Sequence, residues 1–423
     1  MQAVGRILLG MLDDLVASSS WWYHGSAGHA ERLQGTLLLL DRTEDSVSPA
    51  LHFCTYQALV NDLLNVRDGN VITIKAKDKE KEVLLNEKDE LWVKFRHMHI
   101  ADVLGGLSEY LDSIKARNPQ AVKVASGADG TTIQDMSKFV KAMPEYQAQL
   151  DVYSQHLQIA QSCMSHIQAG GQALLNLITD VEQTLATGFD PNGKALRLPL
   201  VIDSLLDEMA SDNAQLKLRL VLILAASQRE KLSEADLDRV CTAAGFTAEE
   251  RSTVSTLRSL DATSVEPTSG GESSSSTGKK KGKWTFSKKL FSSSSSSSSS
   301  AASAAAPAES DFASSRFVCP IKAIAEDLVN GKLSATDFPP LPSGAAIVET
   351  KAVAQSVRRS PGWGAKSKPA FSGARSIIFM AGGVAFAELQ AVALASTESN
   401  KEIILGGTSI LTQKGFIEAL ASV

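Results

Sequence analysis

Cysteine is scarce in this sequence, and the cysteines that are present stand far apart. The four are Cys54, Cys163, Cys241 and Cys319. Because they form no CxxC pair, they offer neither a disulfide framework nor a zinc-type cluster, and they suit a reducing compartment. The sequence therefore predicts a cytoplasmic protein without a structural metal.

A long apolar run is also missing. No segment reaches the roughly 20 consecutive apolar residues that a membrane-spanning helix needs. The first apolar stretch is interrupted by Asp13 and Asp14, where a signal peptide would continue. It instead predicts an amphipathic helix. Its apolar face is expected to consist of Ile7, Leu8, Met11, Leu12 and Leu15.

Strong charge of either sign is absent as well. The 423 residues carry a formal net charge of −5, with 43% hydrophobic and 21% charged residues. These proportions are typical of a globular chain with two or three domains and exclude disorder throughout. The weak net charge argues against a molecule built to coat nucleic acid or an anionic membrane. We therefore expect no nucleic-acid partner.

What the sequence does contain is an α/β pattern interrupted by helices. An apolar strand is predicted at residues 36–40, and strand, helix, strand and helix alternate from about residue 375 to the end. The latter pattern is typical of a βαβ unit with a parallel sheet. The early strand has no partner nearby, so we expect it to join this distant sheet. The fold class predicted is a parallel-sheet α/β domain split by a large, mostly α-helical insertion.

One long segment is expected to be disordered. Residues 263–315 contain serine runs and have too little apolar surface to offset the entropy of ordering. Within them, the basic stretch 279–289 holds six lysines. Such a stretch can attract anionic lipid, and the surrounding serines can be phosphorylated. An inert, solvated loop is the simpler interpretation.

The end of the first strand raises the question of an active site. Asp41 and Asp45 follow the apolar run, with Arg42 between them. Magnesium phosphatases of the haloacid-dehalogenase type place two aspartates two residues apart after such a strand. Here the spacing is four, and no downstream lysine-and-acid set completes the site. A structural corner, in which an Asp–Arg pair fixes the turn, is the simpler explanation, and the phosphatase is the enzyme alternative.

Other candidate sites are weaker. His97 and His99 stand two residues apart in a segment with a helical pattern, which does not place them on one face. His52 lies beside Cys54, but no orienting acid is evident for a thiol nucleophile. The paired glycines in MAGGVAF and LGGTSIL match no nucleotide-binding motif and fit tight turns. We expect no metal and no cofactor.

A heptad stripe marks the helical part. Apolar residues at steps of three and four run from Ile133 to Ile167, a pattern typical of a helix that packs on another long helix. Pro144 interrupts the run and is expected to break or kink it, because a proline inside a helix costs about 3 kcal/mol. Half of the stripe is expected to pack inside its own domain. The remainder can offer a groove to a partner helix.

Several segments together resemble the Sec/Munc-type (SM) family of syntaxin-binding vesicle-fusion regulators, and its secretory branch in particular. LLLLDRTEDSVSPALHFCTYQALVNDLL is similar to the family pattern of an apolar strand, DRG-x-D, Ser/Thr-Pro, LH and T-[FY]-QA. Further segments match in the same order: DELWVKFRHMHIADV, MSKFVKAMPEYQAQLDVYSQHLQIAQSCM, RFVCPIKAIAEDLVNGKL, IIFMAGGVAFAELQAV and EIILGGTSILT.

This resemblance implies a domain organisation. Residues 1–51 and 316–423 would form the split α/β domain, and residues 52–262 the inserted helical domain with a helical hairpin at 132–167. The family fold begins with a further N-terminal domain that has no counterpart here. The resemblance therefore implies a fragment or a truncated product, and a fragment without function of its own is a further alternative.

The function implied by the resemblance is binding, not catalysis. The chain would bind syntaxin and other SNARE proteins, act as a template for their helices in exocytosis, and associate peripherally with plasma or vesicle membranes. The hairpin is the part expected to receive SNARE helices. The residues implied are Asp135, Pro144, Leu150, Tyr153 and Leu157. Leu157→Asp is then expected to weaken this binding with the fold intact, and Pro144→Ala to lengthen the helix and strengthen binding.

Overall fold

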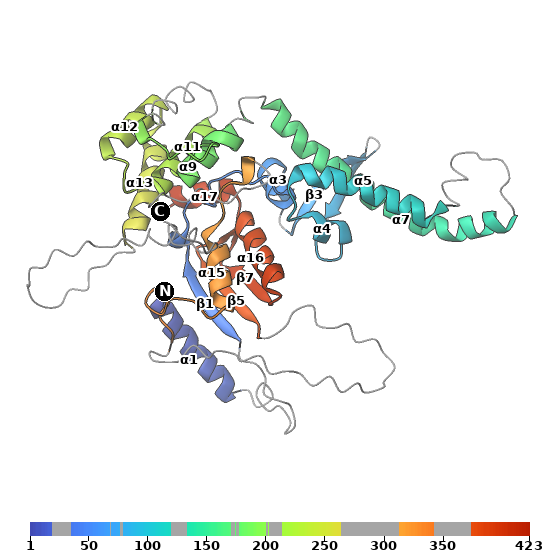
Figure 1. The fold of residues 1–423 in the computed structure, drawn as a ribbon, viewed down its shortest axis with the longest axis horizontal. Coiled ribbons are helices and arrows are strands. Elements are labelled where there is room, and N and C mark those ends of the chain that lie inside the picture. The colour runs from blue at the N-terminus through green and yellow to red at the C-terminus, as the bar shows by residue number, and fades with distance from the viewer. Residues whose placement is uncertain are drawn as a thin grey trace, which may run out of the picture.

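The computed structural model describes most of the chain outside the polar loops. The described residues are 1–18, 35–67, 69–76, 79–119, 133–170, 174, 177–199, 202, 214–263, 313–341 and 374–423. In Figure 1 they form a small sheet with its covering helices and two helical groups beside it. One group contains α3 to α7, and the other contains α9 to α13. Among the described helices, none has the length and apolar character needed to cross a membrane.

A three-stranded parallel sheet joins the two ends of the chain. Strand β1 (Thr36–Asp41) pairs with β5 (Ser376–Ala381), and β5 pairs with β7 (Ile403–Gly407). The predicted pairing of the early strand with the distant βαβ unit is therefore confirmed. The predicted α/β fold class with a parallel sheet is confirmed as well. Two short strands, β6 (Val384–Ala385) and β8 (Ile410–Leu411), form a separate parallel pair.

The two faces of this sheet differ. Helices α15 (Pro320–Val329) and α16 (Phe386–Ser399) pack against each other and contact β5 and β7, respectively. The face with Leu38, Leu40 and Ile378 is buried. The alternate positions are exposed, because side chains of a strand point to opposite faces in turn. They include Leu37, Ile377, Phe379 and Ile404, which are 36–42% exposed.

The N-terminal helix α1 (Gln2–Ser18) lies at one end of this exposed sheet face. A Cβ atom on Gly5 would lie 3.5 Å from Leu39 Cδ1, so this part of the helix is close to β1. Its predicted apolar face is not buried, since Ile7 and Met11 are about two thirds exposed. The predicted helix is therefore confirmed, and these two side chains of its apolar face are exposed.

The inserted part begins with a helix and a small antiparallel sheet. Helix α3 (Tyr56–Leu63) leads into β2 (Val66–Arg67), β3 (Val71–Ala76) and β4 (Lys79–Leu84). Two helices follow, α4 (Glu90–Phe95) and α5 (Ile100–Arg117). Asp89 caps α4, because its Oδ1 accepts hydrogen bonds from the amides of Leu91 and Trp92.

The second helical group follows the long helix α7. It contains a π-helix (Leu177–Glu182), α9 (Gln183–Thr187), α11 (Ala214–Ser227), α12 (Glu234–Ala243) and α13 (Ala248–Thr263). Gly188 ends α9 in the left-handed conformation, with φ of 77°, which favours glycine. The last helix of the chain, α17 (Gln413–Ala421), packs against α13.

Side chains from this part also hold the segment that leads out of the sheet. The backbone of residues 50–52 is hydrogen-bonded by Arg219, Gln413 and Glu182, at 3.1, 3.2 and 2.9 Å. All three side chains are buried. A buried backbone group without a partner is costly, so these bonds stabilise the crossing from sheet to helices.

Helix α7 differs from the expected hairpin. It is one helix of 37 residues, Ile133–Ala169, with Pro144 inside it. Pro144 removes a single backbone hydrogen bond, and the residues after it, such as Gln147 and Ala148, favour helix. The helix therefore continues through the proline, although Figure 1 shows it bent toward its N-terminal end.

The segment expected to be disordered lies mostly outside the described residues. Its last three residues do not fit that expectation, because Ala313–Ser315 form a short 3₁₀ turn. Ser314 is 6% exposed, and its hydroxyl lies 3.0 Å from His99 Nε2. A buried hydrogen bond across the fold orders these residues despite their polar composition.

Candidate functional site

The corner at the end of β1 is built around Arg42. Its guanidinium forms a bidentate ion pair with Glu388 of α16, with Nη1–Oε2 and Nη2–Oε1 distances of 2.7 and 2.6 Å. It also donates to the carbonyl oxygens of Gly383, at 3.1 Å, and Asp45. The sequence indicated a carboxylate of Asp41 or Asp45 as the partner. The ion-pair partner is instead Glu388, which is fully buried.

Both aspartates bind backbone groups close to them in sequence. Asp41 Oδ1 accepts hydrogen bonds from the amide and hydroxyl of Thr43, at 3.1 and 2.9 Å. Asp45 Oδ1 accepts from the amides of Val47 and Ser48, both at 2.9 Å. These are turn-capping bonds of the kind that Asp makes at the start of a turn. Nothing in this arrangement favours the phosphatase alternative.

One of two paired glycines makes room for Arg42. Gly382 and Gly383 have φ values of +93° and +94°, which favour glycine. A Cβ atom on Gly382 would lie 2.6 Å from Arg42 Cβ. The paired glycines therefore belong to a tight turn that lets the guanidinium reach Glu388.

A cysteine thiol, that of Cys319, also lies at this corner. Cys319 is buried, and Ser48 Oγ lies 3.2 Å from its Sγ atom. Burial raises the pKa of the Cys319 thiol well above its ordinary value, and the charge of Asp45 adds to this effect. A thiol held neutral in this way is a poor nucleophile.

The histidines singled out in the sequence do not form a metal site. His99 caps α5, since its Nδ1 accepts from the amide of Ala101 at 3.2 Å. Burial and the charge of Arg96 lower the pKa of His97 to about 4. Within the described ranges, no group of three or more His, Cys, Asp or Glu side chains could hold a metal ion.

His52 and Cys54 also have the properties of side chains that support the fold. His52 Nδ1 lies 2.7 Å from Glu182 Oε1, an acid that the sequence did not reveal. Burial raises the pKa of Cys54 to about 11, so its thiolate is disfavoured.

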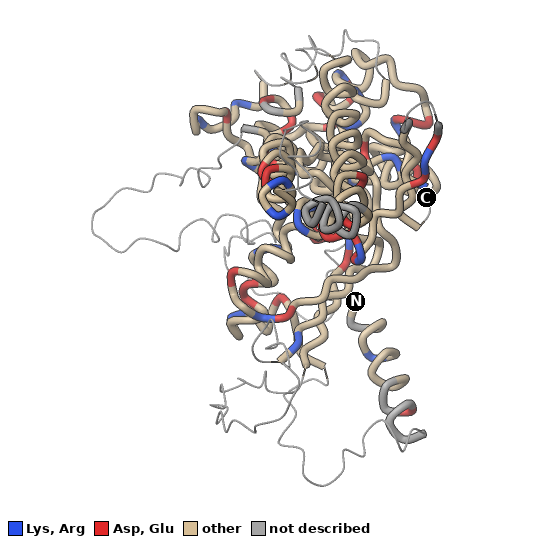
Figure 2. Tube along the Cα trace, turned by 90° about the vertical axis from the view of Figure 1, so that its right-hand side faces the viewer, with Lys and Arg blue, Asp and Glu red and all other residues tan. Residues whose placement is uncertain are grey.

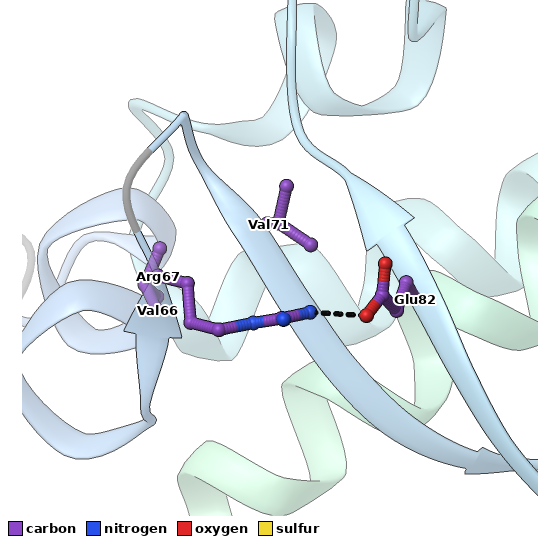
Figure 3. Close-up of a pocket in the computed structure, with 4 residues that line it drawn as sticks. All are labelled: Val66, Arg67, Val71 and Glu82. Carbon is purple, nitrogen blue, oxygen red and sulfur yellow. Dashed lines mark hydrogen bonds and ion pairs between the residues drawn. The ribbon is translucent and has the colours of Figure 1, made fainter.

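A shallow depression lies beside the antiparallel sheet. It has a volume of about 560 Å³ and is lined by Val66, Arg67, Val71 and Glu82. Figure 3 shows Arg67 of β2 reaching across β3 to Glu82 of β4, with a 2.6 Å Nη2–Oε1 distance. Both side chains are more than half exposed, so this ion pair contributes little to stability. The depression holds no acid–base or nucleophile set.

Helix α7 carries the residues implied for partner binding. Tyr153 and Leu157 are partly buried and pack against the core, whereas Leu150 is partly buried without being part of that cluster. Pro144 is exposed. Asp135 lies in the helix, but its side chain is outside the described residues.

The stripe itself divides along the helix. Its C-terminal positions Ala160 and Ile167 are buried, and α7 packs there against α3, α4 and α5. Residues 133–151, which we call the α7 arm, extend beyond these helices (Figure 1). From 144 to 151 the side chains are exposed or partly buried. The arm is thus a helix surface with free positions, attached to a firmly packed second half.

A buried polar chain at the base of the arm was missed in the sequence. His156 of α7 is fully buried, with its Nδ1 3.0 Å from the Tyr56 hydroxyl and its Nε2 2.9 Å from Asp89 Oδ2. The hydrogen bonds from His156 and from the α4 amides outweigh desolvation and lower the pKa of Asp89. The available signal was a histidine inside an otherwise apolar helical stripe.

Known proteins are similar to this chain in sequence and in architecture. A sequence model described as the Sec1 family matches residues 10–419. The chain belongs to the Sec1 family. Among curated proteins, "Protein transport protein sec1" of Dictyostelium discoideum is 28% identical over 403 residues, covering 92% of this chain and 62% of the relative. "SNARE-interacting protein KEULE" of Arabidopsis thaliana is 29% identical, covering 91% of this chain and 60% of the relative.

Solved structures show the same fold. The "Unc18-syntaxin 1 complex from Monosiga brevicollis" aligns with a TM-score of 0.65 at 20% identity, covering 93% of this chain and 62% of that one. "SM Protein Vps45 in Complex with Qa SNARE Tlg2 (1-310)" aligns with a TM-score of 0.65 at 19% identity, covering 99% and 64%. The chain spans about three fifths of the length of the curated relatives it matches.

Proposed function

We propose that this Sec1-family chain binds syntaxin and other SNARE helices and supports vesicle docking and membrane fusion. The observation that carries the proposal is the family match across residues 10–419. One relative is named as a SNARE-interacting protein, and two structural neighbours are titled as complexes with syntaxin 1 and with the Qa SNARE Tlg2. The chain would act as a binding surface for helices, not as an enzyme.

The α7 arm is the proposed binding surface. Its described side chains include Leu150, which is partly buried, and Pro144, which is exposed. SNARE helices bring apolar heptad faces, and such faces dock into grooves or onto helices with matching apolar rows. Tyr153 and Leu157 would line the base of this surface, and Asp135 its far end.

The packing of Leu157 changes the expected result of the substitution Leu157→Asp. Leu157 packs against the core, so an aspartate there would bury a charge and destabilise the fold. Leu157→Asp therefore cannot separate binding from folding. Leu150, which lies outside the core cluster, is the better position for that purpose.

The domain organisation is part of the same proposal. Residues 1–51 and 316–423 would form one α/β domain, into which the helical residues 52–262 are inserted. The parallel pairing of β1 with β5 supports this division. We also propose a cytoplasmic location peripheral to plasma or vesicle membranes. The basic stretch 279–289, outside the described residues, is a candidate aid to that association.

The distribution of charged residues is compatible with attachment to membranes through protein partners. Figure 2 shows acidic and basic residues interspersed along the described chain, in line with the net charge of −5.

Direct binding tests the proposal. The purified chain is mixed with separate recombinant syntaxin and vesicle-side SNARE helices, and co-elution in size-exclusion chromatography is measured. Co-elution with at least one of them is expected. If the chain co-elutes with none of these SNARE helices although circular dichroism shows that it is folded, the proposed function is wrong.

A further inference from the structure

Helix α7 has two unlike halves, and one polar residue lies where they meet. Towards the C-terminus, Ile159, Ala160 and Cys163 are fully buried against neighbouring helices. Towards the N-terminus, the α7 arm has exposed or partly buried side chains from 144 to 151. His156 lies just inside the packed half and is the one buried polar side chain among the described side chains of α7, residues 144–169.

The environment of His156 is fully specified by hydrogen bonds. Its Nε2 bonds Asp89 Oδ2, and its Nδ1 bonds the Tyr56 hydroxyl, which also donates to the His156 carbonyl at 3.3 Å. Asp89 uses its other oxygen to cap α4. Tyr56 is the first residue of α3 and is fully buried, with its ring against Trp92 of α4. The starts of α3 and α4 are thereby tied to one point on α7.

We propose that His156 is a positioning residue that fixes the rotation and register of α7 and so sets the direction of the α7 arm. Its importance for binding rests on the proposed function, because the arm is the proposed SNARE-binding surface. The proposed effect of His156 on the direction of the arm does not depend on the proposed function.

Directionality is the reason to assign this role to the polar chain. Apolar contacts are non-directional, so a row of aliphatic side chains tolerates neighbouring registers of a helix. A slip by three or four residues moves the helix by about one turn, ~5 Å, and brings the apolar row back to nearly the same face. That slip would leave His156, Asp89 and Tyr56 buried without partners, which is strongly unfavourable. A single buried polar residue fixes register in the same way in coiled coils.

Distance along the helix amplifies this restraint. Pro144 lies 12 residues before His156, which corresponds to about 18 Å of helix. Ile133 lies 23 residues before it, about 35 Å away. A small tilt of α7 at His156 therefore moves the far end of the arm by several ångströms, and a rotation about the helix axis turns Leu150 toward or away from a partner.

Three substitutions separate the polar chain from general stability. His156→Leu removes both hydrogen bonds and keeps an apolar side chain. Asp89→Ser keeps a good N-cap for α4 but cannot reach His156. Asp89→Asn keeps both the cap and a polar contact, since its amide can donate to Nε2 while Nδ1–H donates to Tyr56. Cys163→Ala is the matched control, because it removes buried packing from the same helix.

The readout is the distance between two spin labels measured by pulsed electron paramagnetic resonance. Labels are placed on cysteines introduced at Glu145 of the arm and Glu109 of α5, both of which are exposed. The four native cysteines are buried and are not expected to compete for the label. A loss of stability alone lowers the melting temperature without moving this distance.

We expect His156→Leu and Asp89→Ser to shift the main distance by about one helical turn, ~5 Å, or to split it into several. Asp89→Asn and Cys163→Ala should keep the wild-type distance. An unchanged distance in His156→Leu, or the same shift in Cys163→Ala, overturns the inference. If His156→Leu does not fold, Asp89→Ser decides by the same criterion.

SNARE co-elution of the same variants keeps the two proposals distinct. A wild-type chain that binds no SNARE helix disproves the proposed function, while the label distances still test the role of His156. A wild-type chain that binds, together with an unmoved distance in His156→Leu, disproves the positioning role alone.

Discussion

The corner at Arg42 and the α7 arm differ in how far their side chains are accessible to solvent. At the corner, the partly buried Arg42 and the fully buried Glu388 form a bidentate ion pair. In the arm, side chains such as Leu150 and Gln147 remain partly or largely accessible. Charged groups that pair with each other inside the fold suit a structural corner, whereas accessible helix positions suit contact with a partner. The acids at the end of β1 therefore stabilise the turn that follows the strand, and the accessible positions for a partner lie on the α7 arm.

The largest effect is expected from breaking the corner pair. Arg42→Met leaves Glu388 buried without its partner and should lower the free energy of unfolding by about 3–5 kcal/mol. Urea unfolding at pH 7 measures this. Adding Glu388→Gln removes the orphaned charge and should recover part of the loss. A single variant as stable as the wild type would show that the corner is not a main support of the fold.

A smaller effect is expected from the glycine that admits Arg42. Gly382→Ala places a Cβ atom 2.6 Å from Arg42 Cβ at a φ of +93°. Backbone strain of this kind costs of order 1–3 kcal/mol. Gly69→Ala is a matched control, since Gly69 also has positive φ but no atom within 4 Å of an added Cβ. Equal losses in both variants would mean that the φ angle, and not the approach of Arg42, explains the effect.

The base of the arm should show a pH signature of about 1 kcal/mol. The pKa of Asp89 is lowered in the folded chain, mainly by its hydrogen bond to His156 working against desolvation. A lowered pKa stabilises the fold above the unfolded value near 3.9, and that stabilisation is lost as the pH falls through the folded value. Wild type should exceed Asp89→Asn in unfolding free energy by about 1 kcal/mol at pH 7.

That difference should disappear on acidification. Paired urea titrations at pH 7 and pH 3 provide the measurement. A difference that persists undiminished at pH 3 would mean that the Asp89 charge is not its source.

The smallest global effect is expected in the arm itself. Pro144→Ala restores one backbone hydrogen bond in a helix that already continues through this position. Because the arm lies outside the packed half of α7, the unfolding free energy of the whole chain should change by less than about 0.5 kcal/mol. Amide hydrogen exchange around residues 140–148 should nevertheless slow. A large global change would place the arm within the cooperative core.

The sequence allowed much of the fold to be predicted, for identifiable reasons. The run Leu37–Leu40 has no local partner, so its pairing with the strand at 376–381 followed from the need for a sheet. Helix starts are also encoded locally, as at Ser233 and Thr247, because each capping side chain bonds an amide three residues later.

Other features depended on contacts that local patterns do not encode. Glu388 lies 346 residues from Arg42, so no spacing rule could select it as the partner. Pro144 does not break α7, because one missing hydrogen bond does not end a helix of 37 residues, and of the two expected outcomes only a bend is seen (Figure 1). His156 could be recognised as unusual in an apolar stripe, but Asp89 and Tyr56 could not be assigned to it without the structure. The residues implied for partner binding stay predictions.

The most direct test of the account measures the affinity of a labelled vesicle-side SNARE helix for three forms of the chain by fluorescence anisotropy. These are the wild type, Leu150→Asp and the matched control Gln147→Asp, which adds the same charge at an exposed position of the arm. Loss of an apolar contact at the binding surface should weaken binding by Leu150→Asp at least about tenfold. Gln147→Asp should bind like the wild type. Equal affinity of Leu150→Asp and the wild type, with both folded, would contradict the assignment of SNARE binding to the α7 arm.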